Sequence, residues 1–289
     1  MWFYFEMKIA IATCNKVPAL TENEQLILPL LSEREMMTIA SVWDDESINW
    51  SEYDLVIIRS IWDYHLNFER FQVWLNHLEN LNISVLNNVE VLRENSHKFY
   101  LQRLMDEDCS VIPTQFISAG TSLESIEPKW DKAVIKPAIS ASSYRTELFE
   151  FSQWNHIVEK FSKWTKSTDF LIQKFIPEIQ SFGELSIIFF NRKYSHTIIK
   201  RAKANEFRVQ SEYGGKSELY HPSYSVIESA SNVLSKFNGP ILYARIDGTI
   251  INDQFVLMEA ELVEPELFMH LAPGSREQFV NSISDLSKS

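Results

Sequence analysis

The chain has 289 residues, of which 45% are hydrophobic and 23% are charged, a composition typical of a globular protein large enough for two domains. Its formal net charge of -12, without a clustered basic segment, argues against nucleic acid as a partner. No apolar run approaches the roughly 20 residues that a membrane-spanning helix needs, and residues 1–6 lack the basic leader of a signal peptide. Cys14 and Cys109 are too few for a disulfide framework or a thiolate metal site, so we expect a reduced, cytoplasmic protein.

The first third of the chain alternates between strand and helix patterns. Residues 8–14, 38–42 and 54–60 form short apolar runs bounded by polar turns, and residues 22–33 have helical spacing. This alternation predicts a small parallel sheet. A further helix over residues 67–81 presents an apolar face that we assign to the core.

The strand at residues 54–60 ends in polar residues. Arg59 is followed closely by Trp62 and Asp63, and ligands of open parallel sheets bind beyond the carboxyl ends of the strands. Because a guanidinium can bind a carboxylate through two hydrogen bonds, Arg59, Trp62 and Asp63 are candidate substrate contacts. A strand-end salt bridge between Arg59 and Asp63 explains the same residues, and both interpretations stay open.

Two lysines in the middle of the chain are candidate phosphate ligands. The pattern predicts a helix that starts at Ser96 and runs to about Glu107, which places Lys98 in its first turn. Helix N-termini bind anions, so Lys98 belongs either to a phosphate site or to the exposed surface. Lys136 ends a strand over residues 132–136 and is held extended by the proline that follows it.

Further segments complete the middle of the chain. Residues 139–146 are small and hydroxyl-rich, as in loops that fold over phosphates, although they lack glycine. Residues 169–176 read as a strand, and residues 183–201 as a hairpin that opens at Glu184. Residues 200–215 concentrate cations and glycines, which is typical of a mobile anion-binding loop.

The strongest chemical signal is a pair of apolar-rich strands over residues 243–265. They carry four charged residues, Arg245, Asp247, Glu259 and Glu261. Residues two apart share a face of a strand. A two-residue turn at Asn252 and Asp253 would put Asp247 on the opposite face from the two glutamates, whereas a three-residue turn over residues 251–253 would bring all four charges together.

Three carboxylates on one sheet face repel one another unless a cation compensates them. Hard oxygen ligands of this kind suit Mg²⁺, so Asp247, Glu259 and Glu261 are candidate metal ligands. The alternative is an exposed, solvated face with a salt bridge at Arg245. The apolar neighbours of these residues favour a covered sheet.

Taken together, these segments resemble the ATP-grasp superfamily, particularly its glutathione-synthetase-like branch and the ATP-grasp ligases of D-cycloserine biosynthesis. The resemblance is carried by VIKP at residues 134–137, LIQKFI at 171–176, FRVQSEYGG at 207–215 and ARIDG to MEAELVEP within 244–265. It implies a chain of class α/β and α+β with the ATP-grasp fold.

The resemblance also implies an organisation and a reaction. We expect an N-terminal α/β domain, residues 1–92, and an ATP-grasp domain, residues 93–289, whose lobes at about 93–176 and 177–289 enclose ATP. The implied activity is that of an ATP- and Mg²⁺-dependent carboxylate-amine ligase. It would activate a small amino-acid-like carboxylate as an acyl phosphate, for condensation or for ring closure within one substrate. The alternatives are a catalytically idle ATP-binding module and a structural α/β protein, and a homodimer is the usual expectation.

Roles carried over from the family complete the expected site. The phosphates would contact Lys98, Lys136 and the loop at residues 140–143, which includes Ser142 and Ser143. The adenine and ribose would contact Gln173, Lys174, Phe175, Ile176 and Glu184. The metal ligands would be Asp247, Glu259 and Glu261. Arg245, with Lys136, would stabilise the transferred phosphoryl group, and Arg201 and Arg208 match positions that bind the acceptor substrate or phosphate.

Three residues or segments depart from the family pattern. Glu261 stands where many relatives carry asparagine, which adds a negative charge. The phosphate loop has serine in place of glycine, and Gln173 with Lys174 replaces a more usual acidic hinge residue.

Overall fold

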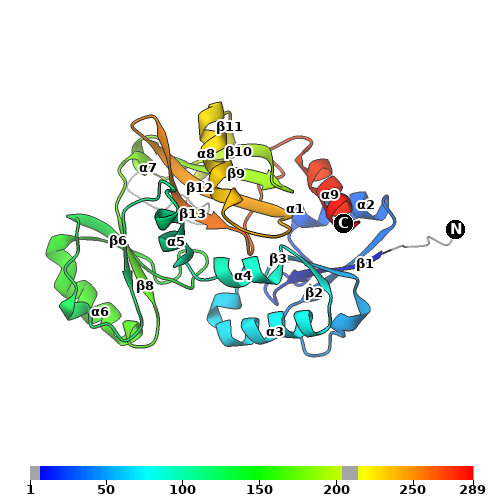
Figure 1. Ribbon diagram of the computed structural model, residues 1–289, viewed down its shortest axis with the longest axis horizontal. Helices are drawn as coiled ribbons and strands as arrows, with labels where there is room; N and C mark the ends of the chain where they lie inside the picture. Colours follow the sequence, from blue (N-terminus) through cyan, green and yellow to red (C-terminus); the bar gives the residue numbers. More distant parts are fainter. Residues whose placement is uncertain (1–6, 204–213, 289) are drawn as a thin grey trace.

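The computed structural model describes residues 7–203 and 214–288, and within them the chain forms three β-sheets (Figure 1). A four-stranded sheet lies in the N-terminal part, a second four-stranded sheet in the middle, and a five-stranded sheet in the C-terminal part. None of the helices in these ranges is long and apolar enough to cross a membrane.

The N-terminal sheet is parallel with strand order β2-β1-β3-β4, as the sequence predicted. Its strands are β1 (Met7–Thr13), β2 (Met36–Val42), β3 (Leu55–Ser60) and β4 (Ser84–Leu86). Helix α3 (Phe68–Asn80) buries the predicted apolar stripe against it. The single helix predicted over residues 22–33 is wrong, because the chain forms α1 (Glu22–Gln25) and α2 (Leu28–Ser32) instead. Pro29 fits only the first turn of a helix, so a new helix starts beside it.

The connection from the first sheet to the second contains α4 (Val89–Asn95) and α5 (Tyr100–Asp106). The predicted helix start at Ser96 is wrong, since Ser96 ends α4, and Asn88 caps that helix by accepting from Val91 N–H at 2.8 Å. Lys98 therefore lies in the turn between two helices. It is only 6% exposed, which excludes the surface-lysine interpretation.

The middle sheet is antiparallel, with strand order β5-β8-β6-β7, and α6 (Trp154–Thr165) packs on it. Its strands are β5 (Thr114–Ile117), β6 (Lys132–Pro137), β7 (Glu147–Glu150) and β8 (Phe170–Lys174). Single-turn 3₁₀ helices occur at Trp50–Glu52, Tyr64–Leu66, Leu123–Ser125 and Phe151–Gln153.

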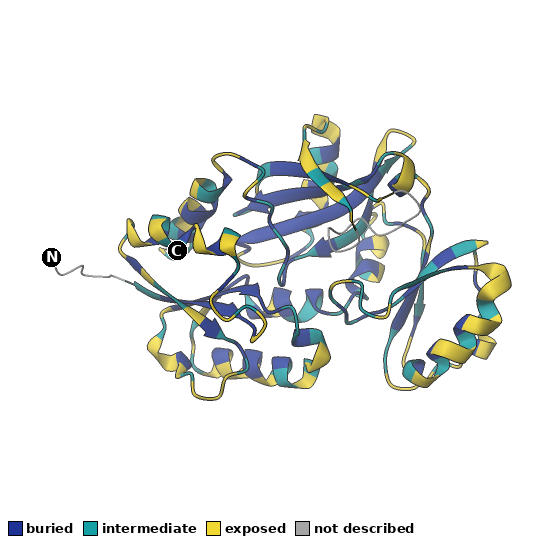
Figure 2. Ribbon diagram, turned by 180° about the vertical axis from the view of Figure 1, so that it is seen from behind, coloured by how far each residue is buried: buried dark blue, intermediate teal, exposed yellow. Residues whose placement is uncertain are grey.

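The third sheet has strand order β11-β10-β9-β12-β13 and is antiparallel. Its strands are β9 (Glu184–Phe190), β10 (Lys193–Arg201), β11 (Lys216–Tyr220), β12 (Tyr243–Ile251) and β13 (Gln254–Glu261). Its helices are α7 (Glu178–Ser181), α8 (Tyr224–Ser235) and α9 (Ser275–Leu286). Figure 2 shows its strands mostly buried, beside helices whose outer surfaces are exposed.

The two faces of this third sheet have different partners. Ile187 and Phe189 point into a core shared with α5 and α8. Ile188 and Phe190, on the other face, pack against the N-terminal sheet and α9. Beyond Ile188 this second face turns polar at Ser186, and there the candidate site lies.

Candidate active site

The four predicted charges of β12 and β13 do lie on one face, but not for the predicted reason. Asn252 and Asp253 form a two-residue turn with φ of 50° and 63°, so the three-residue turn is wrong. Further along, Gly248 pairs with Leu257 and Asp247 with Glu259, which leaves one residue of β13 unpaired. This β-bulge turns the glutamates onto the face of Asp247.

Gly248 permits the bulge because there is no room for a side chain. A Cβ added there would lie 2.4 Å from Val256 O and 2.6 Å from the Phe255 ring. A larger residue would have to displace backbone, so the register of the charged residues depends on this glycine.

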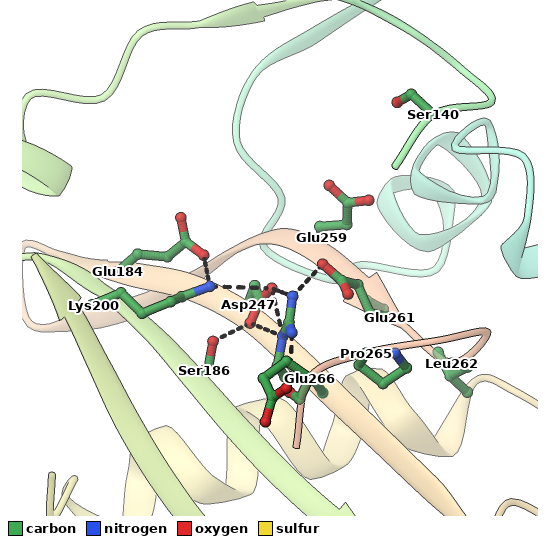
Figure 3. Close-up of polar contacts among 12 residues, drawn as sticks. Ser140, Glu184, Ser186, Lys200, Asp247, Glu259, Glu261, Leu262, Pro265 and Glu266 are labelled. Atoms are coloured by element: carbon green, nitrogen blue, oxygen red, sulfur yellow. Dashed lines mark hydrogen bonds and ion pairs between the residues drawn. The ribbon is translucent and has the colours of Figure 1, made fainter. Parts of the chain in front are cut away.

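Arg245 binds two acidic residues, Asp247 and Glu261, both of which are labelled in Figure 3. Its Nε donates to Asp247 Oδ1 and Oδ2 at 3.1 and 3.0 Å, and its guanidinium also donates to Glu261. The guanidinium also donates to a third residue, at Glu266 O, at 3.0 Å. Arg245 and Asp247 are 8% and 3% exposed, so the alternative of an exposed, solvated face is wrong.

Lys98 and Lys136 converge on Glu259. Lys98 Nζ lies 3.0 Å from Glu259 Oε1, and Lys136 Nζ lies 3.3 Å from Oε2. Lys98 also donates to Ser140 O at 2.8 Å, at the start of the hydroxyl-rich loop. Burial alone would raise the pKa of Glu259, but the two lysines outweigh it and lower the pKa to about 2.

Lys200 is a member of this cluster that the sequence analysis missed. It was grouped with a mobile loop, but it lies in β10, 6% exposed, and pairs with Glu184 across the β9–β10 hairpin. Its Nζ also lies 3.6 Å from Asp247 Oδ2. Ser186 donates to Asp247 Oδ1 at 2.5 Å. The hairpin itself was predicted, but regular pairing counted from its turn would set Glu184 opposite Ile199. The irregularity between Tyr194 and His196 therefore hid the pairing of Lys200 with Glu184.

Carboxyl groups outnumber cations in this part of the described structure. Four cations, Lys98, Lys136, Lys200 and Arg245, face five carboxylates, Glu184, Asp247, Glu259, Glu261 and Glu264. Burial raises the pKa of Glu261 to about 8, with a further contribution from the neighbouring carboxylates, and Arg245 only partly opposes it. Burial likewise raises the pKa of Glu264 to about 7. This face of the third sheet could therefore accept a further cation.

Comparisons with known proteins place this geometry in context. Residues 9–87 match the family described as the N-terminal domain of D-cycloserine synthetase DcsG. The cycloserine biosynthesis protein DcsG of Streptomyces lavendulae is 23% identical over 172 residues. That alignment covers 55% of this chain and 56% of the relative, so the chain matches little more than half of that protein's length.

Solved structures are similar over almost the whole chain. The crystal structure of D-cycloserine synthetase DcsG has a TM-score of 0.87 and 17% identity, covering 97% of this chain and 99% of its own. A RimK domain ATP-grasp protein from Sphaerobacter thermophilus has a TM-score of 0.70 and 15% identity, covering 98% of this chain and 100% of its own.

The chain has the ATP-grasp fold. A D-alanine–D-alanine ligase from Bacillus anthracis is also similar, with a TM-score of 0.69, 13% identity and coverage of 97% of both chains. The predicted fold class and the resemblance to the DcsG ligases are thereby confirmed.

In this ATP-grasp fold the predicted adenine hinge joins the middle sheet to the third sheet. Gln173 and Lys174 end β8, and the buried Gln173 amide donates to Thr114 Oγ1 at 3.2 Å. Phe175 N–H donates to Lys132 O at 3.1 Å. Ile176 packs in a small cluster with Ile112, Ile179, Ala202, Ile251, Val256 and Met258.

The hydroxyl-rich loop adopts an unusual backbone. Ser142, Ser143 and Arg145 have φ of 48°, 57° and 51°, in the region that normally favours glycine. Tyr144 meets His65 of the N-terminal part at a ring distance of 5.1 Å. The loop thus reaches from β6 to the 3₁₀ helix Tyr64–Leu66 of the N-terminal part without glycine.

The predicted substrate residues are less closely gathered. Arg59 is 3% exposed and lies 3.3 Å from Glu24, while Asp63 accepts from Trp43 Nε1 at 2.8 Å, so the salt bridge between Arg59 and Asp63 is wrong. Arg201 is exposed and pairs with Glu218 across β10 and β11. Trp62 is partly exposed just beyond β3, and Arg208 lies outside the described residues.

Proposed function

We propose that the chain is an ATP- and Mg²⁺-dependent ligase that activates the carboxylate of a small amino-acid-like substrate as an acyl phosphate for attack by an amine. One observation carries the proposal. Lys98 and Lys136, from separate elements, meet at Glu259 on the sheet face that also holds Arg245 and Asp247.

This arrangement suits phosphoryl transfer, in which a protein acts mainly by positioning groups and neutralising charge. A triphosphate arriving beside Glu259 would compete for Lys98 and Lys136, which hold that carboxylate in its absence. Arg245 is rigidly held by three acceptors and keeps its charge, so it can stabilise the transferred phosphoryl group and the acyl phosphate.

The donor set fits magnesium. Asp247 and Glu259 pair across neighbouring strands and, with Glu261, offer the hard oxygen atoms that Mg²⁺ prefers. In the described residues each of them is held by basic side chains, and no three carboxylates converge as a preformed metal cluster. Glu259 would therefore become available to a metal ion once the phosphates take up Lys98 and Lys136. When bound, Mg²⁺ would supply positive charge that neutralises the phosphates.

The remaining roles follow the family pattern. Gln173, Lys174, Phe175 and Ile176 would hold the adenine, Glu184 the ribose, and Ser142 with Ser143 the phosphates. Trp62, Asp63, Arg201 and Arg208 stay predicted substrate contacts. For Arg59, burial and the pair with Glu24 favour a structural role, which we propose in place of the predicted substrate contact. Among the relatives, the names cycloserine synthetase and D-alanine–D-alanine ligase suggest an amino-acid-derived carboxylate, either cyclised or condensed with an amine.

The test is ADP release from ATP and Mg²⁺ over a panel of D- and L-amino acids and their derivatives, with hydroxylamine added to trap an acyl phosphate as a hydroxamate. The proposal expects carboxylate-dependent ADP release together with a hydroxamate, and loss of both in Arg245→Met. Tight ATP binding without ADP release for any carboxylate would instead support a catalytically idle ATP-binding module.

A further inference from the structure

Among the described strands, only β12 pairs with β13, and the outer edge of β13 is left without a strand, although β13 carries the candidate metal ligands Glu259 and Glu261. β13 is the last strand in the order β11-β10-β9-β12-β13. Edge N–H and C=O groups must find other partners when they are buried. At Leu257 the partners are backbone groups, since Leu257 N–H donates to Ser110 O at 2.8 Å and Ile112 N–H donates to Leu257 O at 2.9 Å.

Beyond the bulge, side chains replace the backbone as partners. Tyr100 Oη accepts from Ala260 N–H at 2.8 Å and donates to Ala260 O at 2.9 Å. Asn95 donates to Ala260 O at 2.8 Å and accepts from Leu262 N–H at 2.8 Å. Asn87 donates to Leu262 O at 2.7 Å. Three buried side chains thus satisfy all four edge groups of Ala260 and Leu262.

These bonds act on the backbone that carries Glu259 and Glu261. Ala260 lies between the two glutamates and points into the opposite core, so fixing its N–H and C=O fixes where both carboxylates leave the strand. Lys98 lies between Asn95 and Tyr100 in the sequence and binds the Glu259 carboxylate at 3.0 Å. The segment 95–100 therefore holds both the backbone of Ala260 and the side chain of Glu259.

We propose that Tyr100 and Asn95 are positioning residues for the metal and phosphate site. They bind backbone groups of Ala260 and Leu262 that a neighbouring strand would otherwise pair, and so fix the positions of Glu259 and Glu261. The inference rests on the proposed function, which assigns these glutamates to Mg²⁺.

The decisive variant is Tyr100→Phe, which keeps the ring and removes the hydroxyl. Two quantities are measured: amide exchange at Ala260 in the protein without ATP or metal, and the Mg²⁺ concentration that gives half-maximal thermal stabilisation at saturating ATP. We expect faster exchange at Ala260 and a half-saturating Mg²⁺ concentration raised by about tenfold or more, as for other groups that orient metal ligands. Stabilisation by ATP in EDTA should stay as in the wild type, and Asn95→Ser should act in the same direction.

Phe237→Leu is the matched control. Phe237 packs edge-on against the Tyr100 ring at 5.9 Å, so this variant weakens the same core but leaves the hydroxyl and its bonds. It should lower the melting temperature without changing the Mg²⁺ requirement. An unchanged Mg²⁺ requirement in Tyr100→Phe, or an equal rise of that requirement in Phe237→Leu, would overturn this inference and leave the proposed function untouched. A wild-type protein that shows no stabilisation dependent on both ATP and Mg²⁺ would overturn the proposed function, and the inference with it.

Discussion

Two buried arginines hold neighbouring carbonyl groups of one loop, yet their surroundings differ in kind. Arg59 of β3 donates to Pro265 O at 2.9 Å, and its guanidinium lies 4.9 Å from the centre of the Tyr243 ring. Arg245 of β12 donates to Glu266 O at 3.0 Å. By sequence, both were candidates for the site.

Their charged partners separate them. Arg59 faces Glu24, whose carboxylate also accepts from Ser60 Oγ at 2.5 Å, and this pair is closed off from solvent. Arg245 belongs to a cluster with more carboxylates than cations, to which several strands and the α4–α5 turn contribute. A buried arginine at the end of a strand is therefore weak evidence of a site. A cluster in which carboxyl groups outnumber cations, and to which several elements contribute, is stronger evidence of a site.

We expect the largest difference between the two arginines in the rate of catalysis. Arg245→Met removes the charge that we propose to stabilise the transferred phosphoryl group, so we expect the rate of ADP release to fall by about a thousandfold. Arg59→Met is the matched control and should change that rate by less than about tenfold, since buried pairs act mainly on stability. Equal losses in both variants would remove the distinction between the two regions.

The second largest effect that we expect is a loss of stability when Arg59 is replaced. Arg59→Met leaves the Glu24 carboxylate buried without its cation, so we expect the free energy of unfolding to fall by about 3 to 5 kcal/mol. Urea denaturation measures this, and Arg59→Met combined with Glu24→Leu should recover part of the loss. If Arg59→Met instead raises KM for the carboxylate and leaves stability unchanged, Arg59 contacts substrate, as the sequence alone suggested.

The smallest effect concerns the pH dependence of the charged face. The pKa of Glu261 is raised from 4.5 to about 8, so the folded protein holds a proton that the unfolded chain has lost, and its stabilising contribution disappears as pH rises through 8. Glu261→Gln cannot ionise and should lack this loss. Because the side chain is 29% exposed and solvent screens it, we expect wild type to lose only about 1 to 2 kcal/mol relative to the variant between about pH 5 and 9.

Denaturation curves of wild type and Glu261→Gln measured across this pH range supply the test. Parallel pH profiles would contradict the raised pKa of Glu261. Glu259 should not contribute in this window, because its pKa is lowered to about 2 and its stabilising effect is lost only as pH falls from about 4.5 towards that value.

Local patterns in the sequence were enough for much of the fold. Alternation of apolar strands and helices predicted the parallel N-terminal sheet, and the hairpin over residues 183–201 was visible from its turn. The sequence also singled out Lys136 and the four charges of β12 and β13, and the structure brings these together.

The predictions that were wrong concern contacts between residues distant in sequence, or single residues that interrupt regular strand pairing. The bulge opposite Gly248 cannot be read from strand periodicity, because one extra residue shifts the pairing without changing the pattern. Glu24 precedes its partner Arg59 by 35 residues, and only the fold brings them together. Lys200 was missed because its pairing with Glu184 also follows an irregularity in the hairpin, between Tyr194 and His196.

The central claim is that ATP and Mg²⁺ share one site on the face of Asp247 and Glu259. A thermal-shift titration with ATP, with Mg²⁺ and with both, on wild type and on Asp247→Asn combined with Glu259→Gln, tests it most directly. At about 100 times its Kd, a ligand adds roughly 2.7 kcal/mol of apparent stability. The account predicts that the full shift in the wild type needs both ligands and that the double variant loses the metal-dependent part. The same metal-dependent shift in the double variant would contradict it.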